Sequence, residues 1–236
     1  MYRALGELGR PLVNSVDALL DAEDKPQTSW LLSRARIATP PARVVQSLRE
    51  AEEALVELGP SVVKPPYGSL GIGIEPVRPG RDARRRLRRV IAVHGLAYLQ
   101  ALVGRGREDL RLFVVGERVA AAVRRRAAAG SFLTNAHQGG TLSAFTPSAR
   151  LERLAVAAAR TLGLDYAGVD VIETETGPTV LEVNGAPRWR ALLEATGKDM
   201  ADAIAVLAAA RAGATTATKH RGEEGCRRRA LRRRVQ

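Results

Sequence analysis

The sequence predicts an α+β fold in which antiparallel β-hairpins are combined with helices. Stretches 166–187 and 110–126 each contain two runs of β-branched and apolar residues separated by turn residues, which is the pattern of a hairpin. Helices are predicted in three other stretches: the amphipathic 47–58, the basic 81–94 and the periodic, alanine-rich 147–162. The chain has 236 residues, of which 45% are apolar, and can therefore bury a substantial core.

Composition points to a protein of the cytoplasm. The one cysteine, Cys226, cannot form a disulfide framework or a cysteine metal cluster within a single chain. No apolar run approaches the roughly 20 residues that span a bilayer. The first residues also lack the apolar stretch of a signal peptide. We therefore expect a cytoplasmic protein that makes no membrane contact.

The net charge of +12 is concentrated in two segments. Residues 215–236 hold one Lys and seven Arg against two Glu, and residues 81–89 hold six Arg against one Asp. The first segment is predicted to be a disordered basic tail. Two interpretations of this tail stay open: a solvated arm without a dedicated partner, or a weak contact with nucleic acid or an acidic partner.

The first forty residues predict a short strand and two helices. Residues 8–15 have the pattern of a short strand, and Ser15 or Asn14 is placed to cap the helix that follows. Residues 24–36 predict a further helix, with Pro26 in its first turn. One strand and two helices cannot bury their own faces. We therefore expect a preceding segment to be absent or to be supplied by another chain.

A strand, a glycine-rich turn and a second strand are predicted in residues 61–74. The turn contains small residues that let backbone N–H groups approach an anion closely, namely Gly68, Ser69, Gly71 and Gly73. Lys64, at the end of the first strand, supplies a point charge for a phosphate. No helix follows Gly73 directly, so neither the Rossmann fingerprint nor the Walker loop matches. The alternative interpretation is a turn without a ligand.

The hairpin at 110–126 follows an apolar strand at 97–103 and ends in three arginines, Arg124, Arg125 and Arg126. Like charges side by side are unfavourable unless water or an anion such as a polyphosphate compensates them. Residues 131–140 show no period and predict a loop. Two further helices are predicted after the second hairpin, at 189–196 and 198–211.

The hairpin at 166–187 carries oxygen ligands on both strands. Asp170 lies on the first strand, and Glu182 and Asn184 lie on the second. Because residues two apart on a strand point to the same face, Glu182 and Asn184 converge while Val183 enters the core. These hard oxygen donors suit Mg²⁺, which binds through one or two carboxylates and keeps several waters. The alternative is that Asp170 and Glu182 form a polar pair across the strands on a solvated face.

These motifs, in this order, resemble the ATP-grasp superfamily and, within it, the RimK-like α-L-glutamate ligases. They are VVKPPYGSLGIG at 62–73, DLRLFVVG at 109–116 with RRRA at 124–127, TNAHQGG at 134–140, and GVDV and LEVN at 168–171 and 181–184. Asp24-Lys25 is similar to the start of the family's linker helix. PRWRAL at 187–192 resembles relatives associated with tetrahydromethanopterin glutamylation. The resemblance covers residues 8–211.

The resemblance implies an ATP-grasp fold, in which two α/β subdomains clasp ATP, with most of the family's N-terminal α/β domain missing. The implied divisions are a remnant of that domain with the linker helix at 1–40, a small subdomain at 41–103, a large subdomain at 104–212 and the basic tail at 213–236.

The resemblance also implies a set of site residues. ATP contacts are implied for Lys25, Lys64, Gly68, Ser69, Gly71, Gln100, Ala101, Leu102, Asp109, Arg111 and Arg124. Among these, the two lysines would meet the phosphates, Asp109 the ribose, and residues 100–102 the adenine. The implied catalytic residues are Arg126 and Asn135, and the implied ligands of two Mg²⁺ ions, with Mn²⁺ as an alternative metal, are Asp170, Glu182 and Asn184.

The implied activity is that of an ATP- and Mg²⁺-dependent carboxylate–amine ligase, which forms an amide through an acyl phosphate. Its partners would be ATP, an amino acid, in this family often glutamate, and a carboxylate acceptor, either a pterin-type cofactor or a protein terminus. Relatives in this family are often homo-oligomers, but no exposed stripe in this sequence requires one. Ala101, Leu102, Leu133 and Arg188 depart from the family pattern beside the adenine and the acceptor. The alternative is a truncated ATP-grasp chain that binds nucleotide as a subunit, or an inactive remnant.

Overall fold

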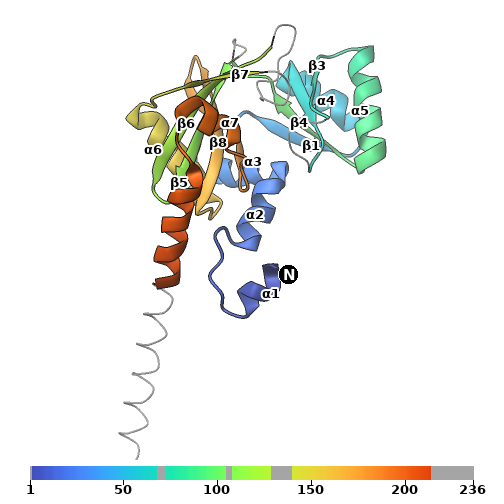
Figure 1. Cartoon of the computed structure of the whole chain (residues 1–236). Coiled ribbons are helices and arrows are strands. Elements are labelled where there is room, and N and C mark those ends of the chain that lie inside the picture. Colours follow the sequence, from blue (N-terminus) through green and yellow to red (C-terminus); the bar gives the residue numbers. More distant parts are fainter. Residues whose placement is uncertain (1, 68–72, 105–107, 129–139, 214–236) are drawn as a thin grey trace, which may run out of the picture.

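The computed structural model describes residues 2–67, 73–104, 108–128 and 140–213. Within these residues the chain forms two antiparallel β-sheets, each covered by helices, that lie side by side as two lobes (Figure 1). The predicted α+β class is confirmed. In the described part of the chain, no helix has the length and the apolar character that crossing a membrane requires.

The smaller lobe is built on a four-stranded sheet. Its strands are β1 (Ala42–Val45), β2 (Ser61–Lys64), β3 (Glu75–Val77) and β4 (Ala97–Ala101), in the order β1-β4-β2-β3. Helices α4 (Leu48–Leu58) and α5 (Arg81–His94) pack on this sheet. Leu55, Leu87 and Leu99 are buried in the core between the sheet and these helices. The helices predicted at 47–58 and 81–94 are therefore confirmed.

Local sequence signals determine both ends of α4. The Ser47 side chain accepts a hydrogen bond from Glu50 N at 3.2 Å, and the Glu50 carboxylate accepts one from Gln46 N at 2.8 Å. This reciprocal arrangement satisfies two backbone donors that would otherwise lack partners at the start of the helix. At the other end Gly59 adopts a φ of 70°, which residues with a side chain rarely adopt, so the helix stops there.

The larger lobe is built on a five-stranded sheet. Its strands are β5 (Glu108–Val115), β6 (Arg118–Arg126), β7 (Thr141–Ala144), β8 (Tyr166–Thr174) and β9 (Gly177–Asn184), in the order β7-β6-β5-β8-β9. Helix α6 (Ala149–Thr161) packs on one face, over Leu112 and Val169. Helix α7 (Arg190–Thr196) and a helix over 200–213 pack against Phe113 on the other face. Both predicted hairpins are confirmed, whereas the sequence pattern does not predict the edge strand β7.

The N-terminal segment contains three helices, α1 (Tyr2–Glu7), α2 (Val16–Glu23) and α3 (Lys25–Arg34). Ser15 caps α2 and Asp24 caps α3 through their side-chain oxygens. The expectation of a strand within 8–15 is wrong, because these residues join no sheet in the described structure. The buried Asn14 side chain instead attaches the segment to the large sheet, through four hydrogen bonds to main-chain atoms of Asp165, Tyr166 and Gly185.

Candidate functional site

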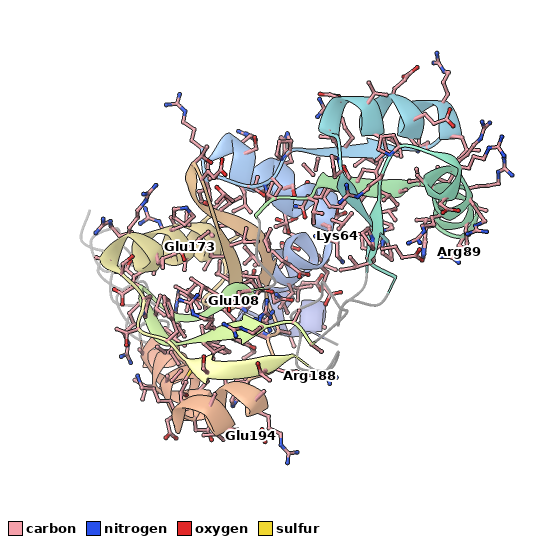
Figure 2. The ribbon with its side chains drawn as sticks, turned by 90° about the horizontal axis from the view of Figure 1, so that it is seen from above. Lys64, Arg89, Glu108, Glu173, Arg188 and Glu194 are labelled. Atoms are coloured by element: carbon pink, nitrogen blue, oxygen red, sulfur yellow. The ribbon has the colours of Figure 1, made fainter. Side chains whose placement is uncertain are left out.

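The two lobes meet around a small cavity that α2, α3, β2, β4 and β9 line. Three charged residues from distant parts of the sequence line it: Lys25 at the start of α3, Lys64 at the end of β2, and Glu182 on β9. Figure 2 shows Lys64 in the middle of the molecule, between the large lobe and the outer helix that carries Arg89. The cavity volume is about 10 Å³, room for about one water.

Lys64 is buried beside this cavity. Its Nζ donates a hydrogen bond to Gln100 Oε1 at 2.6 Å. Burial lowers the pKa of Lys64 below its ordinary value, the charge of Glu182 only partly offsets this effect, and the charge of Lys25 lowers the pKa further. An anion such as a phosphate between the two lysines would favour the charged form of Lys64. The resemblance assigns Gln100 to the adenine, but in this structure its side-chain oxygen accepts the hydrogen bond from Lys64.

Tyr98 and Ser29 extend the polar lining from the small sheet to α3. The Tyr98 hydroxyl lies 2.5 Å from Ser29 Oγ and accepts a hydrogen bond from Gln100 Nε2 at 3.3 Å. Burial raises the pKa of Tyr98 to about 12, so the hydroxyl keeps its proton at neutral pH. The sequence analysis singled out neither residue, because their contact depends on how α3 docks on the small sheet.

The predicted adenine segment lies where the chain passes from β4 toward the large lobe. Ala101 N donates to Pro41 O and Leu102 N donates to Pro60 O, each at 2.8 Å. These two backbone donors are therefore engaged within the chain, and adenine could use them only in exchange for these bonds. The assignment of Gln100, Ala101 and Leu102 to the adenine stays a prediction.

Four charged side chains form a network on the face of the large sheet that carries the predicted metal ligands. Arg111 donates from Nε to Asp170 Oδ1 and from Nη2 to Asp170 Oδ2, both at 2.7 Å. Arg125 donates from Nε to Asp109 Oδ1 at 2.6 Å and from Nη2 to Asp109 Oδ2 at 2.7 Å. The same Nη2 lies 2.9 Å from Asp170 Oδ2. We call Asp109, Arg111, Arg125 and Asp170 the charge quartet.

Strand register brings the charge quartet together. Asp109 on β5 is the cross-strand partner of Arg125 on β6, and Arg111 on β5 is the cross-strand partner of Asp170 on β8. Opposite charges at directly paired positions stabilise a sheet. Because Asp109 and Arg111 are two apart on one strand, both pairs lie on the same face.

The charge quartet is largely shielded from solvent. The side chains of Asp109, Arg125 and Asp170 are 8%, 6% and 7% exposed, and that of Arg111 is 20% exposed. Burial raises the pKa of Asp170, but the charges of Arg111 and Arg125 outweigh it and hold the pKa below its ordinary value. Burial likewise lowers the pKa of Arg125, and the two aspartates raise it above its ordinary value. The two positive charges of Arg111 and Arg125 thus balance the two negative charges of Asp109 and Asp170, because a buried charge without an opposite partner is strongly destabilising.

The predicted convergence of Glu182 and Asn184 on one face is confirmed, and Asp170 on the neighbouring strand shares this face. Asp170 pairs directly with Glu182 and Gly168 with Asn184, while Val183 is fully buried on the opposite side. The oxygens of the two carboxylates and the amide are hard donors that suit Mg²⁺. Among the described residues, no group of three or more His, Cys, Asp or Glu could hold a metal. An ion here would therefore need the amide of Asn184 and water in addition to the two carboxylates.

Arg124 and Arg126 lie on the opposite face of β6 from Arg125, because side chains alternate along a strand. Arg126 Nε donates to Glu108 Oε1 at 2.6 Å, and Arg124 Nη1 donates to Glu108 Oε2 at 3.1 Å. These bonds hold the pKa of Glu108 below its ordinary value. The anion that compensates both arginines is therefore a carboxylate of the chain, where the sequence analysis expected water or a polyphosphate. The roles of Arg124 and Arg126 toward ATP stay predictions. The sequence analysis assigned no role to Arg125.

Part of the predicted site lies outside the described residues. This part comprises Gly68, Ser69 and Gly71 of the glycine-rich turn, the loop residue Asn135, and the basic tail. The roles assigned to these residues stay predictions.

Comparison with known proteins relates the chain to one family over most of its length. The RimK-like ATP-grasp domain family matches residues 22–207. A probable alpha-L-glutamate ligase from Parasynechococcus marenigrum is 33% identical over 202 residues, which cover 84% of this chain and 43% of that protein. A probable alpha-L-glutamate ligase from Xanthomonas oryzae pv. oryzae is 37% identical over 208 residues, which cover 86% of this chain and 70% of that protein. The chain thus spans less than half of the first relative and about two thirds of the second.

Solved structures show the same fold. A RimK domain ATP-grasp protein from Sphaerobacter thermophilus superposes with a TM-score of 0.66 at 25% identity, over 85% of this chain and 72% of that one. D-alanine–D-alanine ligase from Bacillus anthracis superposes with a TM-score of 0.73 at 20% identity, over 92% of this chain and 76% of that one. Together with the family match over 22–207, these comparisons establish that the chain belongs to the RimK-like ATP-grasp family.

Proposed function

We propose that the chain is an ATP- and Mg²⁺-dependent carboxylate–amine ligase that joins glutamate to a carboxylate acceptor. The observation that carries this proposal is the convergence of Lys25, Lys64 and Glu182 on one cavity between the two lobes of an ATP-grasp fold. The names of the relatives, probable alpha-L-glutamate ligases, support glutamate as the amine. We further propose that the small and large subdomains, 41–103 and 104–212, lie on either side of the nucleotide. The acceptor that we propose is a small molecule such as a pterin-type cofactor, or a protein terminus.

A carboxylate is a poor acyl donor, so it must first be activated. One of its oxygens attacks the γ-phosphorus of ATP, the bond to the β–γ bridging oxygen breaks, and ADP leaves. The amine nitrogen then attacks the carbonyl carbon of the acyl phosphate, phosphate leaves with the electron pair of the broken C–O bond, and the nitrogen loses a proton. Both steps place negative charge on phosphate oxygens, so cationic groups accelerate them without a nucleophile from the protein.

The described residues supply charges of the required sign. Lys25 and Lys64 would neutralise phosphate oxygens, and the phosphate would in turn favour the protonated form of Lys64. Mg²⁺, or Mn²⁺ in its place, would be held by Asp170, Glu182 and Asn184 and would reduce the negative charge of the phosphates that it contacts.

The test measures ADP release by the purified chain with Mg²⁺, ATP, glutamate and a set of carboxylate acceptors. We expect acceptor-dependent ADP release by the parent chain, and rates lower by about 100-fold or more for Lys64→Ala and Glu182→Ala. Arg89→Ala, on the outer helix of the small lobe (Figure 2), is the control and should match the parent. Mass spectrometry of the acceptor should show the addition of glutamate. A chain that binds ATP but releases no ADP with any acceptor would contradict the ligase assignment and favour a nucleotide-binding subunit.

A further inference from the structure

The two arginines of the charge quartet differ in how they are held. Arg125 is 6% exposed and contacts both aspartates, whereas Arg111 is 20% exposed and bonds to Asp170. We propose that Asp109 and Arg125 are positioning residues of the metal site, and that Arg111 is a displaceable counter-ion that occupies Asp170 until a divalent cation binds. This inference rests on the proposed function, which makes Asp170 a metal ligand.

The Asp109–Arg125 pair leaves Asp170 available to a metal. Arg125 forms a bidentate pair with Asp109, in which Nε and Nη2 donate to the two carboxylate oxygens at 2.6 and 2.7 Å. Of these two nitrogens, Nη2 also lies 2.9 Å from Asp170 Oδ2. Asp109 therefore supplies the anion that a buried guanidinium requires. Without the charge of Asp109, the full attraction of Arg125 would fall on Asp170 and would compete with a metal ion there.

Arg111 occupies the oxygens of Asp170 that a metal ion would use. It donates a hydrogen bond to each carboxylate oxygen at 2.7 Å, so a divalent cation must share these oxygens with Arg111 or displace it. Displacement is easier for Arg111 than for Arg125, because the partly exposed Arg111 can turn toward water. Arg125 could leave only by unpairing two buried carboxylates, which costs far more.

This inference gives Asp109 a different partner from the ribose that the resemblance assigns to it. Both oxygens of Asp109 already accept hydrogen bonds from Arg125, and the side chain is 8% exposed. A ribose contact would have to take one of these bonds. The two roles differ in what the removal of the charge would change, namely metal affinity or the affinity for nucleotide without metal.

The test measures Mn²⁺ binding to the full chain by electron paramagnetic resonance without nucleotide, because ADP itself binds Mn²⁺, and ADP binding by calorimetry in the presence of a chelator. For Asp109→Asn we expect the Kd for Mn²⁺ to rise by about 10- to 100-fold, the size of effect that residues outside the ligand set have on a metal site, because the charge of Arg125 would then act on Asp170 alone. The metal-free affinity for ADP should stay within about twofold, because the partner of Asp109 is Arg125 and not the ribose. For Arg111→Gln we expect the opposite, a Kd for Mn²⁺ lower by about tenfold, because a repelling charge is gone.

Two further variants distinguish a specific change in Mn²⁺ affinity from a loss of folding. Asp109→Asn combined with Arg111→Gln restores the balance of buried charge, so it should fold as the parent does and bind Mn²⁺ more tightly than Asp109→Asn alone. Glu108→Gln is the matched control, because Glu108 pairs with arginines on the opposite face of the same two strands. Its Kd for Mn²⁺ should stay within about twofold of that of the parent. Thermal unfolding of each variant checks that it is folded.

The outcomes separate the inference from the proposed function. A parent chain that binds neither Mn²⁺ nor ADP overturns both. If the parent binds both ligands, weaker metal-free ADP binding by Asp109→Asn with unchanged Mn²⁺ affinity overturns the positioning role and identifies a ribose contact. Weaker Mn²⁺ binding by Arg111→Gln overturns the counter-ion role.

Discussion

At the scale of single residues, Asn14 joins the N-terminal segment to the strands that carry the predicted metal ligands. Its Nδ2 donates to the carbonyl oxygens of Tyr166 and Gly185 at 2.8 and 2.7 Å. Its Oδ1 accepts from the N–H groups of Asp165 and Tyr166 at 2.6 and 3.0 Å. Asn14 is 5% exposed, so bulk water would not replace these bonds. Since Gly185 directly follows Asn184, the same bonds hold the end of β9.

We expect Asn14→Ala to lower the free energy of unfolding by about 3 kcal/mol or more, because each buried main-chain group that loses its partner costs about 1–3 kcal/mol. Urea denaturation followed by circular dichroism measures this change. Gln46→Ala, which removes an exposed amide, is the control and should change the free energy by less than about 0.5 kcal/mol. Equal effects of the two substitutions would show that the four bonds of Asn14 contribute nothing.

At the scale of secondary-structure elements, α4 depends on the reciprocal bonds of Ser47 and Glu50 at its start. The hydrogen bond from Gln46 N is the main reason that the pKa of Glu50 lies below its ordinary value, and the Ser47 side chain lowers it further. A carboxyl group with a lowered folded pKa adds stability above its unfolded pKa of about 4.3. This contribution is lost as the pH falls through the lower pKa of the folded chain.

Glu50→Gln should therefore lower the urea midpoint at neutral pH, and the difference from the parent should shrink as the pH falls below the unfolded pKa of about 4.3, where the parent loses the same contribution. The measurement is a series of urea titrations across this pH range. Glu53→Gln is the matched control on the same helix, because Glu53 takes part in an exposed ion pair with Arg49 at 3.6 Å and not in the cap. A midpoint difference for Glu50→Gln that does not change with pH would argue against this account of the cap.

At the scale of the whole molecule, the candidate site lies between two lobes that have separate cores. Lys64 belongs to the small lobe and Glu182 to the large one, and both line the same cavity. A ligand that contacts both residues binds only when both lobes are folded and docked. Such a ligand stabilises the folded chain by mass action.

Mg²⁺ with ATP should accordingly raise the free energy of unfolding by about 2.7 kcal/mol at a ligand concentration 100 times the Kd. Differential scanning calorimetry with and without the ligand measures the rise in Tm. Lys64→Ala should lose this rise, whereas Arg89→Ala, whose side chain pairs with Glu75 on the outer face, should keep it. A rise of equal size in Lys64→Ala would place the nucleotide elsewhere.

The positive charge of the small lobe is also arranged at this scale. The arginines of α5 form ion pairs near the surface, an exposed one between Arg84 and Glu52 at 3.5 Å and a half-buried one between Arg86 and Glu75 at 3.1 Å. Exposed pairs of this kind contribute little to stability, because water and salt screen them. Figure 2 shows Arg89 at the outer edge of the molecule, away from Lys64, so the basic helix does not form the lining of the cavity.

Local patterns explain why so many of the elements could be predicted. The helices over 47–58 and 81–94 and both long hairpins follow from periodicity, turn residues and caps, all of which act over a few residues. The strand expected within 8–15 is wrong because local signals do not decide the conformation of this segment. The contact that holds it joins Asn14 to main-chain groups more than 150 residues away.

The sequence by itself determined most of the helices, both long hairpins and the common face of Glu182 and Asn184, because alternation along a strand is a local property. Only the tertiary structure decided which charges meet. Asp109 pairs with Arg125, 16 residues away, and Arg111 pairs with Asp170, 59 residues away. These partners depend on the register between strands and on the burial that the sheet creates. Neither quantity can be read from the neighbours of a residue in the sequence.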